Sequence, residues 1–232
     1  MPGRGNLRGM TETIPTRLRI DFVSDVVCPW CAIGLASLEQ ALERVRGEVE
    51  ADIHFQPFEL NPQLPAEGED AAGHLQRKYG MSAEQAASNQ QAIVDRGAAL
   101  GFTFDMARRS RIYNTFDAHR LLHWAGGEGR QRELKHALLR AYFTDGRDVS
   151  NRDTLVQLAG DTGLDAERAR TVLEAGEFTD EVRADEEFFI QAGIRGVPAI
   201  IIERKHLISG GQPVEVFEQA LREVAAMKEP GK

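Results

Sequence analysis

The order in which the hydrophobic pattern changes along the chain is the feature that most constrains its fold. Residues 18–60 show the pattern of a strand, an amphipathic helix and a second strand, and residues 197–227 show two short strands followed by a helix. Neither flank has enough strands to form a sheet alone, so we predict that the two flanks combine in one four-stranded sheet. The expected strands are 18–23, 51–60, 197–202 and 205–209.

Between these flanks, residues from about 71 to 192 have an almost continuous helical pattern. Ser82 and Gln85 form the pattern of a capping box, and glycines follow most of the helical segments. The expected helices cover 82–101, 114–125, 130–145, 150–160 and 179–192, with a short one beginning at 165. We interpret this stretch as an insertion into a single α/β domain. The predicted organisation is a flexible tail at 1–16, the first part of the core at 17–62, the helical insertion at 63–177, the second part of the core at 178–227 and a C-terminal tail at 228–232.

Charge and hydropathy argue against two classes of partner. The formal net charge of the 232-residue chain is −8, whereas nucleic acids and anionic lipid surfaces are bound by excess Lys and Arg. No apolar run approaches the ~20 residues that cross a bilayer. Residues 1–16 also lack the apolar segment of a secretory signal. We therefore expect a cytoplasmic protein without nucleic-acid or membrane partners.

The two cysteines of the chain lie in the sequence Cys28-Pro29-Trp30-Cys31, between the first expected strand and the following helix. Proline is favoured in the first turn of a helix, which makes Cys28 the N-cap. A sulfur in this position meets unpaired backbone N–H groups and the positive end of the helix dipole, which favour the nucleophilic thiolate. Cys31, one turn further on, is placed to attack a mixed disulfide on Cys28. Trp30 is expected to flank the sulfur.

Two other uses of the cysteines have to be weighed. A structural zinc site generally needs four ligands, but the chain has no second C-x-x-C pair, and His119 and His123 are its only histidines at H-x-x-x-H spacing. No metal site is therefore predicted. Two inert, buried cysteines remain an alternative. The order strand, dithiol, helix favours redox chemistry.

Three stretches carry a resemblance to a known family: residues 21–25 leading into the C-P-W-C sequence, residues 114–120, and Gly196-Val197-Pro198. With these stretches the chain resembles the DsbA-like branch of the thioredoxin superfamily, and more closely the FrnE-type oxidoreductases. The resemblance extends from about residue 17 to residue 226. It implies an α/β fold with a thioredoxin-like core, a large all-helical insertion, and disulfide oxidoreductase activity at a CXXC motif.

The resemblance also implies where substrate binds. It predicts a cis peptide before Pro198, with Val197 and Pro198 beside the dithiol and with Pro29 and Trp30 completing the substrate-binding surface. The sequence departs from relatives in two ways. It lacks the export signal of periplasmic DsbA proteins, and it lacks the second cysteine pair that some FrnE-type proteins carry near the C-terminus.

Three further residues are candidate auxiliary groups. Asp21 is expected either as a carboxylate beneath the dithiol, with a pKa raised by burial so that it accepts a proton from Cys31, or as a solvent-facing strand residue. His119 either points towards the dithiol or forms an ordinary hydrogen bond at a domain interface. Asn114 is included because it begins the matching stretch that contains His119.

The first functional hypothesis is thus a thiol–disulfide oxidoreductase in which Cys28 attacks and Cys31 resolves. The alternative is a glutathione-dependent isomerase or transferase of the kappa or 2-hydroxychromene-2-carboxylate isomerase type, although those enzymes generally carry Ser where Cys28 stands. A non-enzymatic binding module is a third reading. No cofactor is expected besides the redox-active dithiol, with glutathione as a candidate co-substrate. The expected partners are protein or small-molecule thiols and disulfides, and the protein is expected to be a monomer or a homodimer.

Overall fold

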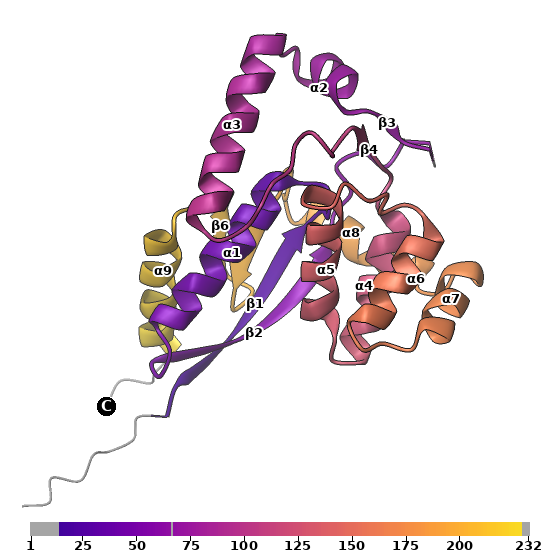
Figure 1. Ribbon diagram of the computed structural model, residues 1–232. Helices are drawn as coiled ribbons and strands as arrows, with labels where there is room; N and C mark the ends of the chain where they lie inside the picture. The colour runs from indigo at the N-terminus through magenta and orange to yellow at the C-terminus, as the bar shows by residue number, and fades with distance from the viewer. Residues whose placement is uncertain (1–13, 66, 229–232) are drawn as a thin grey trace, which may run out of the picture.

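A four-stranded sheet forms the centre of the molecule in the computed structural model, which describes residues 14–65 and 67–228 (Figure 1). Strand β1 (Thr16–Ser24) pairs in parallel with β2 (Val49–Pro57), and helix α1 (Pro29–Arg44) connects them. On its other side β1 pairs antiparallel with β5 (Ala199–Ile202), which pairs antiparallel with β6 (His206–Ser209). The order β2-β1-β5-β6 confirms that the two flanks of the sequence build one sheet.

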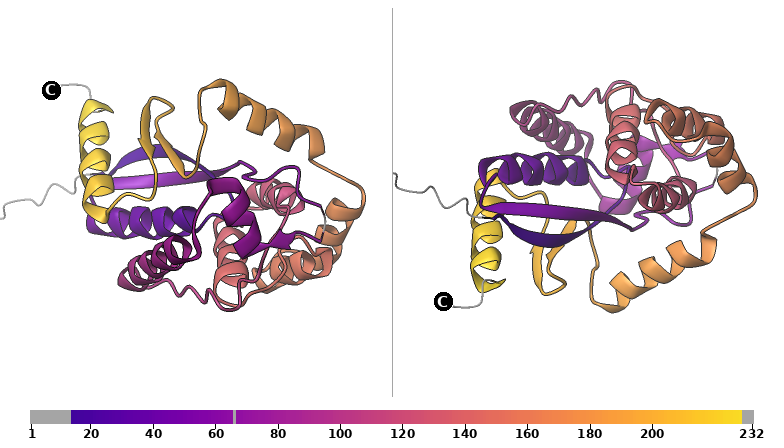
Figure 2. Two further views of the ribbon diagram at one scale, coloured as in Figure 1. Left: turned by 90° about the horizontal axis from the view of Figure 1, so that it is seen from above. Right: turned by 90° about the horizontal axis from the view of Figure 1, so that it is seen from below.

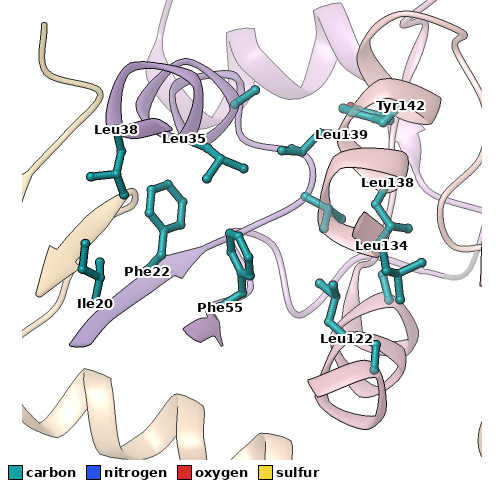
Figure 3. Packing of buried hydrophobic residues seen from close by; sticks show 14 of the residues in the cluster. Ile20, Phe22, Leu35, Leu38, Phe55, Leu122, Leu134, Leu138, Leu139 and Tyr142 are labelled. Atoms are coloured by element: carbon teal, nitrogen blue, oxygen red, sulfur yellow. The ribbon is translucent and has the colours of Figure 1, made fainter. Parts of the chain in front are cut away.

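Alternation along β1 decides which side chains enter the core. Leu18, Ile20 and Phe22 are fully buried and point to the face covered by α1 and by helix α9 (Val214–Lys228). Figure 3 shows Phe22 and Phe55 beneath the apolar side of α1, and their ring centres lie 5.7 Å apart. Because successive strand residues point to opposite faces, residues 19 and 21 lie on the other side of the sheet.

The insertion enters between β2 and β5 and packs beside the sheet (Figures 1 and 2). Its buried side chains, among them Leu121, Leu134 and Leu138, belong to the same apolar cluster as those of the sheet, so the two parts share one core. None of the helices in the described part of the chain is long and apolar enough to span a membrane. The elements of this region are β3 (Glu69–Asp70), α2 (Ala71–Tyr79), α3 (Ala83–Ala99), β4 (Arg111–Ile112), α4 (Phe116–Gly127), α5 (Gln131–Phe143), α6 (Arg152–Asp161), α7 (Ala166–Glu174) and α8 (Thr179–Gln191).

Helix caps explain where several of these elements begin. The capping box is confirmed, because the Gln85 backbone N–H donates to Ser82 Oγ at 3.2 Å and the Ser82 N–H donates to Gln85 Oε1 at 2.9 Å. The predicted start of α6 at Ser150 is wrong by one residue. Asn151 is the N-cap, and its side-chain oxygen accepts the backbone N–H of Thr154 at 3.0 Å.

Candidate active site

The dithiol lies where β1 leads into α1. Cys28 is the N-cap of α1, with extended backbone angles of φ −91° and ψ 113°, and Pro29 occupies the first turn. Both cysteines are free thiols. Cys28 is 4% exposed and Cys31 is fully buried, so Cys28 is the sulfur nearer to solvent. The Cys28 side chain makes no capping hydrogen bond in this state; its thiol instead donates to the Val197 carbonyl oxygen, with 3.6 Å between the atoms.

The Val197–Pro198 peptide is cis, as the resemblance implies, and its loop packs against α1. The close approach depends on Gly34 of α1, because a Cβ built there would stand 3.0 Å from Pro198 Cγ and 3.4 Å from Gly211 Cα. Gly211 is equally constrained, since a Cβ on it would stand 2.9 Å from the Trp30 carbonyl oxygen. Two glycines therefore let this loop and the turn before α9 lie directly on the dithiol helix.

Cys31 lies in an environment that disfavours its thiolate. Burial raises the pKa of the Cys31 thiol well above its ordinary value, and the hydrogen bond and the charge of Cys28 raise it further. The positive charge of Lys135 and a hydrogen bond with the Asp25 backbone act in the opposite direction. Cys31 therefore holds its proton more tightly than an ordinary thiol does, as a resolving thiol should.

Lys135 is a functional candidate that the sequence analysis missed. It comes from α5, in the insertion, and is only 1% exposed. Its ammonium group lies 5.9 Å from the centre of the Phe55 ring, and no group in the described residues accepts a hydrogen bond from it. Burial lowers the pKa of Lys135, while the negative charges of Cys31, Asp25 and Cys28 oppose that effect. Lys135 is thus a buried cation within electrostatic reach of the dithiol.

Asp25, rather than Asp21, is the carboxylate buried near the dithiol. It is fully buried in the loop between β1 and Cys28, and its Oδ2 accepts the Leu60 backbone N–H at 2.8 Å. Its Oδ1 lies 3.4 Å from His119 Nε2. Burial acts to raise the pKa of Asp25, but the interactions with His119 and Leu60 outweigh it and lower the pKa below its usual value.

Asp21 has a different setting from both sequence expectations. Its side chain is buried on the sheet face opposite α1, where its carboxylate accepts hydrogen bonds from Arg19 at 2.7 Å and from Gln56 at 2.7 Å. Burial acts to raise the pKa of Asp21, but these hydrogen bonds overcome it and lower the pKa. The expected raised pKa is therefore wrong, and Asp21 is an ion-paired residue rather than a proton acceptor.

The other two auxiliary candidates come from the segment around α4. His119 is buried and directs Nε2 towards Asp25. Asp25 therefore lies between His119 and the dithiol region. Asn114 has a local role: its Oδ1 accepts the Phe116 backbone N–H at 3.0 Å where α4 begins, and its Nδ2 donates to the Pro62 carbonyl at 3.4 Å. His123, one turn further along α4, has its Nδ1 3.6 Å from Asp185 Oδ2.

Helices α2 and α3 contribute side chains around Cys28, the less deeply buried of the two cysteines. Trp30 is 39% exposed, and the Arg96 guanidinium lies 5.9 Å from its ring centre while donating to the Gly211 carbonyl at 2.8 Å. Tyr79 ends α2 and is half-exposed. Burial and, next, the charge of Cys28 raise the pKa of Tyr79, which places the phenol within electrostatic reach of the sulfur. Sequence analysis missed Arg96 and Tyr79, because neither lies in a recognisable motif.

Metal binding finds no geometric support at this site. Among residues 14–65 and 67–228, no group of three or more His, Cys, Asp and Glu side chains is arranged to hold an ion. The arrangement is instead that of a strand, a reduced dithiol at a helix N-terminus and a facing cis-proline loop.

Comparison with known proteins assigns this arrangement to a family. The family model for the DSBA-like thioredoxin domain matches residues 19–222. The uncharacterized protein YwbO of Bacillus subtilis is 28% identical over 205 residues, which cover 88% of this chain and 96% of YwbO. The probable DsbA oxidoreductase SCO1869 of Streptomyces coelicolor is 38% identical, with a TM-score of 0.86 and 93% of each chain covered. The cytosolic disulfide reductase DsbM of Pseudomonas aeruginosa, solved with GSH, shares the fold at 17% identity and a TM-score of 0.63, with 90% of this chain and 100% of DsbM covered. The chain therefore belongs to the DSBA-like thioredoxin family and is a disulfide oxidoreductase of that family.

Proposed function

We propose that the protein exchanges disulfides through Cys28 and Cys31, with Cys28 as the attacking sulfur. The observation that carries this assignment is the difference between the two thiols: Cys28 caps α1 and is the less deeply buried sulfur, whereas Cys31 is fully buried with a raised pKa. The Cys28 thiolate attacks one sulfur of a partner disulfide and forms a mixed disulfide, while the other partner sulfur leaves as a thiol. Cys31 then gives up its proton and attacks the Cys28 sulfur, which forms the Cys28–Cys31 disulfide and releases the second partner thiol.

Substrate would bind along the cis-proline loop. The Val197 carbonyl already lies next to Cys28, so a partner joined to that sulfur passes alongside Val197 and Pro198. An extended partner chain can hydrogen-bond to this main chain as an added strand does. Pro29 fixes the entry to α1, and Trp30 offers a partly exposed apolar surface beside the sulfur.

Lys135 and Asp25 are proposed to control the proton of Cys31. The charge of Lys135 favours the Cys31 thiolate, which is the form needed for resolution. Asp25 is ionised at neutral pH because its pKa is lowered, and its negative charge balances Lys135 in the interior. His119 fixes the Asp25 carboxylate from α4 and so acts as a positioning residue.

We further propose that the protein is a FrnE-type enzyme in the cytoplasm. Glutathione is the proposed co-substrate, and no cofactor is expected besides the redox-active dithiol. These assignments are supported by the matching C-P-W-C and G-V-P sequences and by the fold shared with DsbM, a protein described as cytosolic and solved with GSH. The proposed partners are protein or small-molecule thiols and disulfides. The protein itself is proposed to be a monomer or a homodimer.

An insulin reduction assay with dithiothreitol, and separately with glutathione, tests the proposal. The protein should accelerate insulin reduction, and Cys28→Ser should abolish the acceleration. Stimulation by glutathione as the only reductant supports the co-substrate assignment. Isomerisation of 2-hydroxychromene-2-carboxylate without insulin reduction would contradict the proposed function and favour the isomerase alternative.

A further inference from the structure

Five buried side-chain atoms lack a hydrogen-bond partner in the part of the chain that the structure describes. Four of them are Asp25 Oδ1, His119 Nε2, Glu59 Oε1 and Glu186 Oε1. A buried polar atom without a partner is costly and rare in native proteins, so its presence calls for an explanation. We call these four residues, together with Arg183, the buried polar chain.

The inner end of the buried polar chain is Asp25, which lies next to the resolving thiol. The Cys31 sulfur hydrogen-bonds with the Asp25 backbone, and the Leu60 backbone N–H donates to Asp25 Oδ2 at 2.8 Å. Asp25 Oδ1 lies 3.4 Å from His119 Nε2, but the two atoms are not aligned for a hydrogen bond. One carboxylate oxygen of Asp25 is therefore free beside an imidazole nitrogen that can take up a proton.

The outer end of the buried polar chain is held together by Arg183 of α8. Its Nη1 donates to Glu59 Oε2 and to Glu186 Oε2, the latter at 2.7 Å. Its guanidinium lies 3.7 Å from the centre of the Phe116 ring. Glu59 follows β2, whereas Glu186 lies one turn after Arg183 on α8. Each carboxylate thus uses one oxygen for Arg183 and keeps the other one free.

Helix α4 joins the two ends, because it packs against α8 on both sides of His119. Phe116 is one turn before His119 and makes the contact with α8 described above. His123 is one turn after it, and its Nδ1 lies 3.6 Å from Asp185 Oδ2. His119 therefore faces α8 between these two contacts, where its charge acts on Glu186.

Solvent exposure rises from the inner to the outer end of the buried polar chain. The exposed fractions of the side chains are 0% for Asp25, 2% for His119, 9% for Glu186 and 47% for Arg183. Burial raises the pKa of Glu186, and the charge of Glu59 adds to this effect, whereas the pKa of Asp25 is lowered. A proton placed on Asp25 therefore moves outward to a carboxylate that holds it more firmly and lies nearer to water.

We propose that Asp25, His119 and Glu186 form a proton relay that carries the proton of Cys31 to the surface during resolution of a mixed disulfide. The inference rests on the proposed function, in which Cys31 is the resolving thiol, and adds a route for the proton that this thiol must lose. The remaining members of the buried polar chain position the Glu186 carboxylate.

The resolution step balances without a further oxidant or reductant. Cys31 Sγ forms a bond to Cys28 Sγ, while the bond from Cys28 to the partner sulfur breaks and the partner leaves with the electron pair as a thiolate. The proton of Cys31 passes to the Asp25 carboxylate and then to the neutral imidazole of His119. From the imidazolium it passes to the Glu186 carboxylate, which releases it to water. The partner thiolate takes up a proton from solvent, and all members of the relay return to their first charge state.

Stopped-flow mixing of the reduced protein with dithiobis(nitrobenzoate), a disulfide whose thiolate is coloured, tests the relay. Attack by Cys28 releases the first nitrothiobenzoate at a rate that depends on the reagent concentration, and resolution by Cys31 releases the second at a rate that does not. The test variant is Glu186→Gln, which keeps the size of the side chain and its hydrogen-bonding oxygen but cannot accept the proton. The matched control is Asp185→Asn, the same change at the neighbouring residue of α8, outside the buried polar chain.

Glu186→Gln should slow the second release at least about tenfold at pH 7, since proton transfer by a positioned side chain contributes at least that much, and should leave the first release unchanged. In the parent, the second rate should fall as the pH drops through the pKa of Glu186, because protonated Glu186 accepts no proton. This inflection should be absent from Glu186→Gln and retained by Glu186→Asp. Glu59→Gln should move it to lower pH, because the charge of Glu59 adds to burial in raising the pKa of Glu186. Asp185→Asn should keep the parental rates and pH profile.

Equal second-release rates in the parent and Glu186→Gln, or an acid inflection that persists in Glu186→Gln, would overturn the relay and leave the assignment of Cys31 intact. Equal slowing of both releases would also overturn it, because Glu186 would then have a structural role. By contrast, a parent protein that releases only one nitrothiobenzoate would refute the proposed function itself, because Cys31 would then not resolve the mixed disulfide.

Discussion

His119 Nε2 lies 3.4 Å from Asp25 Oδ1, and both side chains are almost completely buried. The two residues come from different parts of the fold: Asp25 from the loop that leads to the dithiol, and His119 from α4 of the insertion. Their interaction is a main reason why the pKa of Asp25 is lowered although burial opposes its charge. The insertion thus helps to lower the pKa of a buried carboxyl group in the loop that leads to the dithiol, and this arrangement has measurable consequences.

Replacing Asp25 should change the pH dependence of stability. The folded-state pKa of Asp25 is below its unfolded value, so its stabilising contribution is fully present above about pH 4, the ordinary carboxyl pKa, and is lost as the pH falls through the lower folded pKa. Asp25→Asn should therefore cost about 1–3 kcal/mol at pH 7 and progressively less below pH 4. Urea unfolding from pH 3 to pH 7 measures this, and a difference that grows towards acid pH would contradict it.

The two cysteine variants should fail in different ways. Cys28→Ser removes the attacking sulfur, so disulfide exchange should fall to the uncatalysed background. Cys31→Ser should still attack a partner disulfide but accumulate a mixed disulfide that mass spectrometry detects, because no thiol resolves it. Turnover of Cys31→Ser at the parental rate without added thiol would show that the assigned roles are wrong.

The raised pKa of Cys31 should be measurable in a variant that lacks the Cys28 thiol. In Cys28→Ser the charge and hydrogen bond of Cys28 are absent, but the burial that raises the pKa of Cys31 remains. Thiolate absorbance at 240 nm should therefore develop above about pH 8.5, the value of a free cysteine. A midpoint at or below that value would mean that Cys31 is not desolvated as the structure indicates.

Gly34→Ala should loosen the contact between α1 and the cis-proline loop. The added Cβ would stand 3.0 Å from Pro198 Cγ, and overpacking of this kind costs about 1–3 kcal/mol. Gly127→Ala is the control, since it adds a methyl group in open space within a helix and should raise stability by about 0.5–1 kcal/mol. Thermal unfolding measures both, and equal shifts would show that the contact at Gly34 relaxes freely.

Much of the fold and the centre of the site follow from local sequence signals. Cys28 becomes the N-cap because a strand ends before it and Pro29 suits the first turn. The dithiol and the Val197-Pro198 sequence are recognisable motifs, and the structure brings them into contact. By contrast, the sheet formed by β3 and β4 was not predicted, because each strand has only two residues and its partner lies some forty residues away.

Local sequence signals did not locate the buried charged residues. Alternation in β1 already separates Asp21 from Ile20 and Phe22, which face α1, so the choice of Asp21 overlooked an available signal. Asp25 follows the end of the strand, where alternation no longer indicates direction. Lys135 adjoins the apolar residues of α5, but it is buried only because α5 packs against both β2 and the neighbouring helices, which is a tertiary effect.

Lys135→Met should separate stability from catalysis. Burial lowers the folded-state pKa of Lys135, so protonated Lys135 lowers the free energy of unfolding at neutral pH. This destabilisation disappears as the pH rises through the folded-state pKa towards the unfolded value of about 10.4. Replacing a buried charge by an apolar side chain of similar size is often neutral or stabilising, by up to about 4 kcal/mol. The variant should therefore equal or exceed the parent in stability at pH 7, with the difference narrowing towards pH 10.

The same variant should impair the thiol chemistry, because the charge of Lys135 opposes the rise in the pKa of Cys31. Without it, Cys31 should ionise at higher pH and resolve a preformed Cys28 mixed disulfide more slowly, which quenched-flow mass spectrometry measures. Lys135→Arg retains a cation and should preserve more of the resolution rate than Lys135→Met. If Lys135→Met instead lowered stability and left the rate and pH profile of resolution unchanged, Lys135 would be a packing residue without influence on the dithiol.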